Sequence, residues 1–253
     1  MIKGILFDKD GTLIDFYSVW GEAAYTVAGR LCENHGVPEA QEEVLKSLGV
    51  ENGRADPEGA LAWKSYAGIA EDLAPILGMA LDVEGLTKEV TRDFFEEVAM
   101  KRTEYPVFTD LPRMMEALWR QDIRIGLATT DEPQSTQICM EILKIDEFIS
   151  FWGTAGKGLP EKPDGRLIRL AAEEWRIEPS EIAVVGDTPN DMRFAAGGGA
   201  VGIAVLSGTG GRKALEPLSD YIIDSVADLP GFIEKINFGE EEDDGGNKAC
   251  ACL

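Results

Sequence analysis

Two carboxylates near the beginning of the chain have a spacing that suits catalysis or metal binding. Asp8 and Asp10 are separated by one residue and follow a short, mostly apolar run at residues 2–7. Gly11 comes next and lets the backbone turn sharply. Two negative charges this close are costly unless a cation lies between them or one carboxylate keeps its proton. The pair therefore fits divalent-metal binding, proton transfer, or a solvated turn that merely ends a strand.

Groups that could hold phosphate oxygens occur later in the chain. Thr129 and Thr130 follow the apolar run 123–128 and offer hydroxyls and backbone N–H groups, although threonines in this position also cap helices. Lys162 precedes a helical pattern, where a lysine is commonly solvated surface. Lys157 lies five residues earlier and competes for the same role, but only Lys162 is followed by proline.

A second pair of acids has the same arrangement as the first. Asp187 and Asp191 follow the apolar run 182–185 and a glycine. Taken alone, they fit a turn with a capped helix equally well. Their position after a predicted strand makes them candidates to meet Asp8 at one edge of a sheet, where open α/β sheets bind ligands.

The elements that must position these residues alternate between strands and helices after Pro106. Alternation of this kind predicts parallel strands joined by helical crossovers. The buried run 2–7 fits a central strand of the same sheet. The predicted strands are 123–128, 148–152, 182–185, 200–206 and 221–223, and the predicted helices are 111–121, 134–143 and 167–175.

A helical block separates the first strand from the rest of the sheet. Residues 20–31 and 86–95 carry apolar side chains at three-to-four spacing, which predicts amphipathic helices. The glycine- and proline-containing segment 49–59 is interpreted as a loop inside this block. Its cation, Arg54, could face a substrate, although surface charge is the commoner role of a loop arginine.

The composition limits the kinds of partner. The 253 residues carry a formal net charge of -22, which argues against binding to nucleic acid or to an anionic membrane. An anionic substrate would need a local metal or basic pocket. The four scattered cysteines suggest neither a disulfide framework nor a zinc site, and we expect a cytoplasmic protein without a membrane span.

Three other features are interpreted as structural. We expect the five tryptophans, Trp20 among them, to serve in packing, and the glycine-rich segment 207–211 to form a turn. The acidic tail 239–253 has the composition of a disordered segment. Its last four residues, which include Cys250 and Cys252, loosely match a prenylation box, but an acidic run precedes them where a basic one is usual.

These features together resemble a known family. Asp8 to Thr12, then Thr129, then Lys162-Pro163, then Gly186 to Asp191 resemble the four ordered motifs of the haloacid dehalogenase (HAD) superfamily. The resemblance covers nearly the whole chain except its tail. Because Asp10 is present, the chain is more similar to phosphatases of the phosphoglycolate phosphatase kind than to the dehalogenases, which generally lack this acid.

The resemblance implies a fold and a set of domains. It implies an α/β protein with a Rossmann-like parallel sheet core and an inserted α-helical cap domain. Residues 1–14 and 104–238 would form the core, and residues 15–103 the cap.

The resemblance also implies a function, namely Mg²⁺-dependent hydrolysis of a small phosphomonoester. Asp8 would be the nucleophile that forms an aspartyl-phosphate, and Asp10 the general acid and base. Asp8, the Asp10 backbone carbonyl and Asp187 would bind Mg²⁺, with Asp191 as indirect support. Phosphate oxygens would be held by Thr129 or Thr130 and by Lys162.

Three alternatives stay open at this point. A sugar-phosphate mutase resembling β-phosphoglucomutase would use the same aspartyl-phosphate. A phosphonate hydrolase would need a cap lysine as Schiff-base nucleophile, for which Lys46 and Lys64 are the candidates. A catalytically idle phosphate-binding module would keep the ligand without turnover. The sequence leaves the particular phosphomonoester and the oligomeric state undetermined.

Overall fold

A six-stranded parallel sheet organises the second half of the chain and takes its central strand from the first residues. The computed structural model describes residues 1–239, apart from residues 52–53, 57–58, 156–157, 159 and 161. The strand order is β5-β4-β1-β6-β7-β8. The strands are β1 (Gly4–Phe7), β4 (Arg124–Ala128), β5 (Ile149–Gly153), β6 (Ile182–Gly186), β7 (Val201–Val205) and β8 (Tyr221–Ile223).

Strand β1 lies in the middle of the sheet because all its residues are suited to burial. It pairs with β4 on one side and β6 on the other, so that Phe7 lies level with Leu127 and Val185. From β1 the chain continues to β4 and β5 on one side of the sheet, then returns to β6 and continues to β8 on the other. This reversal of direction beside β1 creates the crevice in which open α/β sheets bind ligands.

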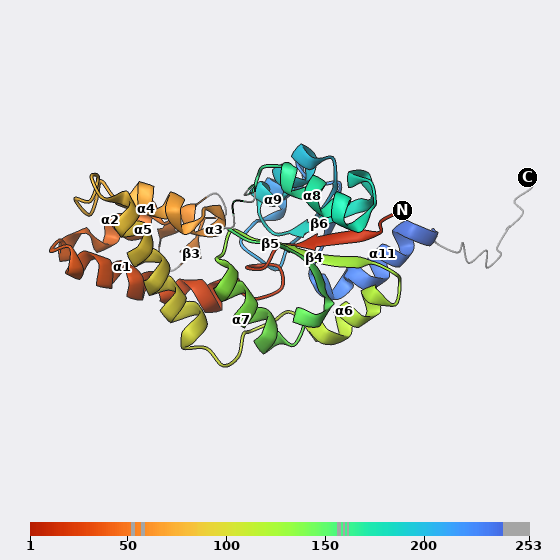
Figure 1. Ribbon diagram of the computed structural model, residues 1–253, viewed down its shortest axis with the longest axis horizontal. Helices are drawn as coiled ribbons and strands as arrows, with labels where there is room; N and C mark the ends of the chain where they lie inside the picture. The colour runs from red at the N-terminus through yellow and green to blue at the C-terminus, as the bar shows by residue number, and fades with distance from the viewer. Residues whose placement is uncertain (52–53, 57–58, 156–157, 159, 161, 240–253) are drawn as a thin grey trace, which may run out of the picture.

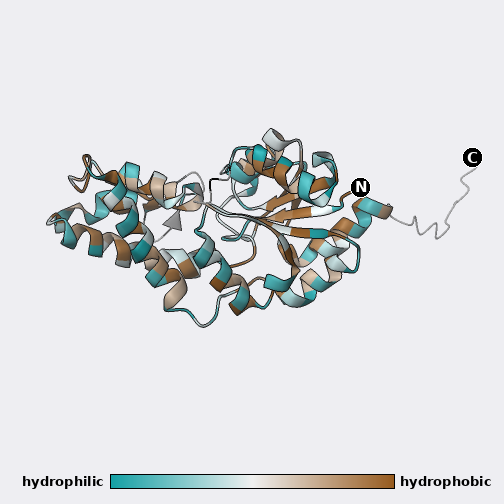
Figure 2. Ribbon diagram, in the orientation of Figure 1, coloured by the Kyte–Doolittle hydropathy of each residue, from teal (hydrophilic) through white to brown (hydrophobic). Residues whose placement is uncertain are grey.

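Helices cover both faces of the sheet (Figure 1). Ile5 and Phe7 join one buried cluster, while Leu6 points to the opposite face and joins another. The apolar strands lie between these two layers (Figure 2). Helices α6 (Leu111–Trp119), α7 (Pro133–Leu143) and α11 (Leu229–Phe238) contribute to the first cluster, α8 (Arg166–Trp175) and α9 (Pro189–Gly198) contribute to the second, and α10 (Arg212–Leu215) follows β7.

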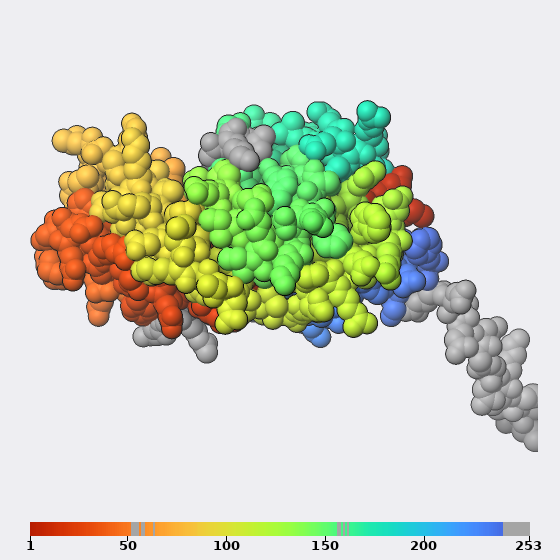
Figure 3. Space-filling model, turned by 60° about the horizontal axis from the view of Figure 1, so that its bottom comes forward, coloured from red at the N-terminus to blue at the C-terminus, as the bar shows by residue number. Residues whose placement is uncertain are grey.

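The segment from Asp15 to Pro106, here called the helical segment, lies beside one end of the sheet (Figure 1). Figure 3 shows it packed against the part of the chain around α7. Its interior includes the rings of Trp20, Tyr66 and Phe94, and the centroid of Phe94 lies 5.5 Å from each of the other two. The helices are α1 (Glu22–Asn34), α2 (Gln41–Ser47), α3 (Ala60–Trp63), α4 (Tyr66–Leu73) and α5 (Val83–Phe95), with π-helical turns at Tyr17–Gly21 and Glu96–Met100.

The chain leaves the sheet for this helical segment and returns from it at one place. Ile14 forms an antiparallel bridge with Val107, and the Asp15 N–H donates to the Pro106 carbonyl at 2.9 Å. The two chain segments that connect the helical segment to the sheet are therefore hydrogen-bonded to each other.

The structure confirms the predicted α/β fold but differs from the prediction in the segment 49–59. Here Val50–Glu51 (β2) and Arg54–Ala55 (β3) pair as short antiparallel strands. The sequence carried a signal for this hairpin, since Asn-Gly at residues 52–53 is the dipeptide that two-residue hairpin loops favour. Among the described residues, no helix is both long and apolar enough to cross a membrane. The tail prediction for residues 240–253 lies outside the described residues.

Candidate active site

The carboxylate of Asp8 lies at the carboxyl end of β1, next to a buried lysine. The Asp8 N–H donates to the Val185 carbonyl at 2.8 Å, which continues the pairing of β1 with β6. Lys162 Nζ lies 2.5 Å from Asp8 Oδ1 and 2.7 Å from Asp191 Oδ1. All three side chains are buried. Burial alone would lower the pKa of Lys162, but Asp191 and Asp8 raise it above its ordinary value, so the ammonium form is favoured.

Asp187 and Asp191 are held by groups on the loops around them. Thr209 donates to Asp187 Oδ2 from its backbone N–H at 2.7 Å and from its hydroxyl at 3.0 Å. Thr188 donates to Asp191 Oδ2 in the same two ways, at 3.0 and 2.6 Å. Thr209 belongs to the segment that we interpreted as a turn. Only the adjacency of β6 and β7 brings this turn onto Asp187, so no spacing in the sequence indicated the contact.

Three carboxylates of this group could hold a divalent cation. Asp8, Asp187 and Asp191 each offer an oxygen within 4.8 Å of the others. Burial, followed by the charge of Asp191, raises the pKa of Asp187 to about 7, and burial likewise raises the pKa of Asp8. A bound cation would offset this repulsion and desolvation. The donor set, made of carboxylate oxygens, suits a hard cation such as Mg²⁺.

The carboxylate of Asp10 is not part of this group of three and contacts a second buried lysine. Lys9 Nζ lies 2.7 Å from Asp10 Oδ2 and 3.1 Å from Asp131 Oδ2. Trp20 Nε1 donates to Asp10 Oδ1 at 2.5 Å. Burial raises the pKa of Asp10, although Lys9 and the Trp20 hydrogen bond act in the opposite direction. The net effect is a pKa above the ordinary value of an aspartate.

The two predicted phosphate-binding threonines lie on the loop that follows β4. Thr129 donates its N–H to the Gly153 carbonyl at 2.8 Å, and its hydroxyl accepts from the Asp131 N–H at 3.1 Å. Thr129 and Thr130 both line the cavity beside Asp8. Tyr66, on α4 of the helical segment, donates its hydroxyl to Asp131 Oδ1 at 3.2 Å.

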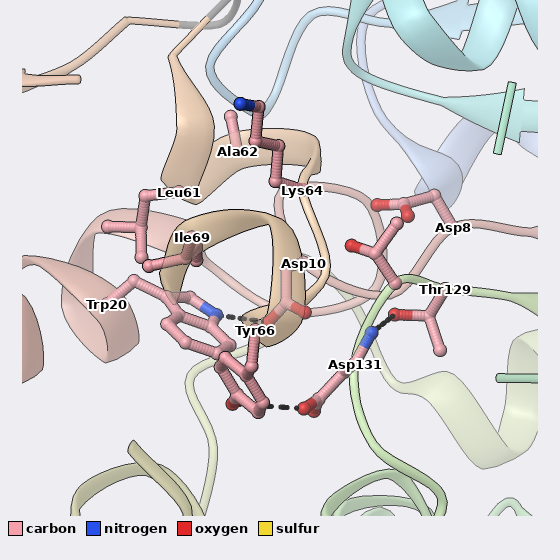
Figure 4. A pocket seen from close by; sticks show the side chains of 11 residues that line it. Asp8, Asp10, Trp20, Leu61, Ala62, Lys64, Tyr66, Ile69, Thr129 and Asp131 are labelled. Atoms are coloured by element: carbon pink, nitrogen blue, oxygen red, sulfur yellow. Dashed lines mark hydrogen bonds between the residues drawn. The ribbon is translucent and has the colours of Figure 1, made fainter. Parts of the chain in front are cut away.

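A narrow pocket brings together Asp8, Asp10, Thr129 and Thr130 (Figure 4), and its lining does not include Lys162, Asp187 or Asp191. Its open space is about 20 Å³, room for about one water molecule. Asp8 and Asp10 line it on the sheet side, and α3 and α4 of the helical segment close it on the other. The lining residues are Asp8, Asp10, Trp20, Leu61, Ala62, Lys64, Tyr66, Ile69, Thr129, Thr130 and Asp131.

The remaining candidate cations are distributed differently. Lys64 lines the pocket and forms an ion pair with Asp72, with 2.6 Å between Nζ and Oδ2. Lys46 is exposed on α2 and does not line this pocket. The Arg54 backbone belongs to β3, but its side chain lies outside what the structure describes, as does the whole of Lys157. A Schiff base on Lys64 would require it to leave its ion pair.

Comparisons with known proteins agree with this geometry. The model of the haloacid dehalogenase-like hydrolase family matches residues 2–199. A phosphoglycolate phosphatase from Chromobacterium violaceum is 29% identical over 229 residues, which cover 90% of this chain and 95% of that protein. A pyrophosphatase, PpaX, from Bacillus cereus is 25% identical over 181 residues, or 66% of this chain and 81% of that protein. The crystal structure of a β-phosphoglucomutase from Clostridium difficile has a TM-score of 0.67 at 16% identity, with 94% and 98% of the two chains covered.

Proposed function

Because the chain belongs to the haloacid dehalogenase-like hydrolase family, we propose that it is a Mg²⁺-dependent phosphatase acting on a small phosphomonoester. The observation that carries the proposal is the placement of Asp8. Its carboxylate ends the central strand, contacts the buried ammonium of Lys162, and lies next to Asp187 and Asp191. A nucleophile, a cation and a metal-binding group are thus gathered at one point, as phosphoryl transfer requires.

The reaction proceeds in two steps. A carboxylate oxygen of Asp8 attacks phosphorus, and the bond from phosphorus to the leaving oxygen breaks as Asp10 gives that oxygen its proton. This leaves an aspartyl-phosphate, the free alcohol, and Asp10 as a carboxylate. In the second step Asp10 takes a proton from a water that attacks the phosphoryl group. The bond between phosphorus and the Asp8 oxygen breaks, inorganic phosphate departs, Asp8 is again a carboxylate and Asp10 is again protonated.

Local hydrogen-bond donors and cations stabilise the negative charge of the transferred phosphoryl group, although the protein carries a net charge of -22. Lys162 and the hydroxyls of Thr129 or Thr130 bind the phosphoryl oxygens. Asp8, Asp187 and the Asp10 backbone carbonyl would hold Mg²⁺, which would neutralise charge between the carboxylate nucleophile and the anionic phosphate. Asp191 supports the site indirectly, because its Oδ1 accepts a hydrogen bond from Lys162 Nζ at 2.7 Å.

We further propose that residues 15–103 act as a cap over a core made of residues 1–14 and 104–238. The cap is attached through the paired connection at Ile14 and Val107. With about 20 Å³ open between cap and core, a phosphomonoester gains access only if the cap moves away, and closure then excludes water. Phosphoglycolate and pyrophosphate are the first substrates to test in view of the two relatives.

The test is phosphate release from a panel of small phosphate esters and pyrophosphate, with Mg²⁺ and with EDTA. Release that depends on Mg²⁺ supports the proposal and ranks the substrates. A bisphosphate intermediate and an isomerised sugar phosphate without net phosphate release would indicate the mutase chemistry of the structurally similar β-phosphoglucomutase. Tight binding without turnover of any substrate, by folded protein, would indicate a binding module.

A further inference from the structure

We infer that Lys9 is a positioning residue that fixes the proton-transferring carboxylate of Asp10, an inference that rests on the proposed phosphatase function. Lys9 lies between the two aspartates of the first motif but points away from the metal-binding cluster, toward Asp131. None of the roles given above to nucleophile, metal or phosphate binding uses Lys9. Its placement inside the site therefore calls for an explanation of its own.

The contacts of Lys9 are those of a buried charge held in one position. Its side chain is 3% exposed, and its Nζ lies 2.7 Å from Asp10 and 3.1 Å from Asp131. The Trp20 ring closes a third side, with its centroid 5.6 Å from Nζ. A buried ammonium is stable only when paired and hydrogen-bonded. The Asp131 side chain is 2% exposed and that of Asp10 16%, so Lys9 cannot turn toward solvent and keep both partners.

Asp131 is the anchor that sets the position of Lys9. Its Oδ1 accepts from the Tyr66 hydroxyl at 3.2 Å and from the Glu132 N–H at 2.8 Å. Its Oδ2 accepts from the Ser135 hydroxyl at 2.9 Å, on the side where Lys9 approaches. Three donors besides Lys9, one from α4 and two from the start of α7, thus hold this carboxylate. Because Lys9 Nζ contacts both Asp131 and Asp10, the position of Asp131 also restricts the position of the Asp10 carboxylate.

Asp10 is thereby held at both oxygens. Trp20 binds Oδ1 from the helical segment, while Lys9 binds Oδ2 from the end of β1. A carboxylate has about four lone-pair sites, so two donors still leave sites for the proton that Asp10 transfers. The contacts set the plane of the carboxylate in the pocket. A general acid needs this orientation because the proton must lie within hydrogen-bond reach of the leaving oxygen.

A role in orienting Asp10 predicts a dependence on the leaving group. Loss of an alkoxide from phosphorus needs the proton of Asp10, whereas acetate leaves from acetyl phosphate without one. The quantity to compare is kcat/KM, because it contains only the steps up to departure of the leaving group. If Lys9 orients Asp10, removal of Lys9 lowers kcat/KM for alkyl phosphates and leaves kcat/KM for acetyl phosphate largely unchanged.

The experiment compares Lys9→Met and Asp131→Asn with the unaltered protein on an alkyl phosphate and on acetyl phosphate. We expect Lys9→Met to lose about 10²-fold in kcat/KM on the alkyl phosphate and much less on acetyl phosphate. Asp10→Asn should give the same pattern and serves as the reference. Asp131→Asn keeps an amide that can bond to Tyr66 and Ser135 while removing the charge that holds Lys9, so it tests the same point if Lys9→Met does not fold.

Lys3→Met is the matched control. Lys3 lies on the same N-terminal segment and pairs with Glu181, but its side chain is 49% exposed and far from the pocket lining. This substitution should leave kcat/KM unchanged on both substrates. Equal losses on the two substrates in the Lys9 and Asp131 variants, or no loss on either, would overturn the positioning role. If the unaltered protein released phosphate from neither substrate, the proposed function itself would be refuted.

Discussion

Two buried lysines flank the end of β1, and each lies between two carboxylates. Lys162 bridges Asp8 and Asp191, whereas Lys9 bridges Asp10 and Asp131. The first cluster is built from β1 and from the loops and helix that follow the later strands. The second is completed by Tyr66 and Trp20 from the helical segment. The groups that we propose for phosphoryl transfer thus come from the sheet and its loops, while the proposed proton-transfer group, Asp10, also depends on how the helical segment is docked.

The core cluster should show the largest effect. Asp8→Asn removes the nucleophile, and we expect turnover to fall by at least about 10³-fold with the fold retained, since a buried charge is replaced by a neutral group of the same shape. Phosphate release and circular dichroism measure the two outcomes. Asp164→Asn, which removes an aspartate paired with Arg166 in a more exposed position, is the control. Retained turnover in pure Asp8→Asn protein would assign the nucleophile elsewhere.

Lys162→Met should have the next largest effect. It removes the ammonium proposed to bind a phosphoryl oxygen, and it leaves Asp8 and Asp191 without their shared cation. We expect kcat/KM to fall by about 10²- to 10³-fold on alkyl phosphates and acetyl phosphate alike. Lys3→Met again serves as the control. A loss confined to alkyl phosphates would mean that the two lysine clusters do not divide the chemistry as we propose.

Trp20→Phe tests the dependence on the helical segment more finely. Phenylalanine keeps a ring beside Tyr66 and Phe94 but loses the N–H that donates to Asp10 Oδ1. We expect about a tenfold loss of kcat/KM on alkyl phosphates and little change on acetyl phosphate. Trp152→Phe, which removes an indole N–H bonded to the Ile149 carbonyl, is the matched control. Unchanged kinetics would show that the core alone orients Asp10.

The pH dependence of stabilisation by the metal should be the smallest of these effects. Burial and Asp191 raise the pKa of Asp187 from 3.8 to about 7. Without metal, the folded protein binds more protons than the unfolded chain between these values, so its stability falls as pH rises through this window. Bound Mg²⁺ favours the ionised carboxylates, and it should therefore stabilise the protein more at pH 8 than at pH 5.

Thermal unfolding with Mg²⁺ and with EDTA measures this difference. At a hundredfold excess of Mg²⁺ over Kd, we expect an increase in Tm of about 5–10 °C at pH 8 and a smaller one at pH 5. Asp187→Asn should reduce the increase at both values. An equal increase at the two pH values would show that protons and the metal do not compete for this cluster.

The local sequence was sufficient to predict most elements of the sheet. The run 182–185 corresponds to β6 (Ile182–Gly186), and residues 221–223 are β8 as predicted. Short apolar runs bounded by glycine and polar residues indicate such strands from the local sequence pattern alone. The strands of the hairpin at Val50–Glu51 and Arg54–Ala55 have two residues each, too few for alternation to be visible, so its local signal was the Asn-Gly dipeptide between them, which the interpretation as a loop did not use.

The sequence by itself determined which residues gather with Asp8. Asp187 and Thr129 each follow a strand that pairs with β1, and parallel strands that pair in register bring their carboxyl ends to the same edge of a sheet. Their meeting therefore follows from the order of the strands along the chain, and the motif order was enough to predict it.

Only the tertiary structure decided the surroundings of Asp10. Lys9 could have pointed to solvent, Trp20 could have served in packing alone, and Asp131 could have been a helix cap. Their contacts depend on how α4 and the turn at Tyr17–Gly21 dock over the sheet edge. That docking is set by burial of the rings of Trp20, Tyr66 and Phe94, which are up to 74 residues apart in the sequence. Non-directional apolar packing of this kind leaves no fixed spacing in the sequence from which the contacts could be read.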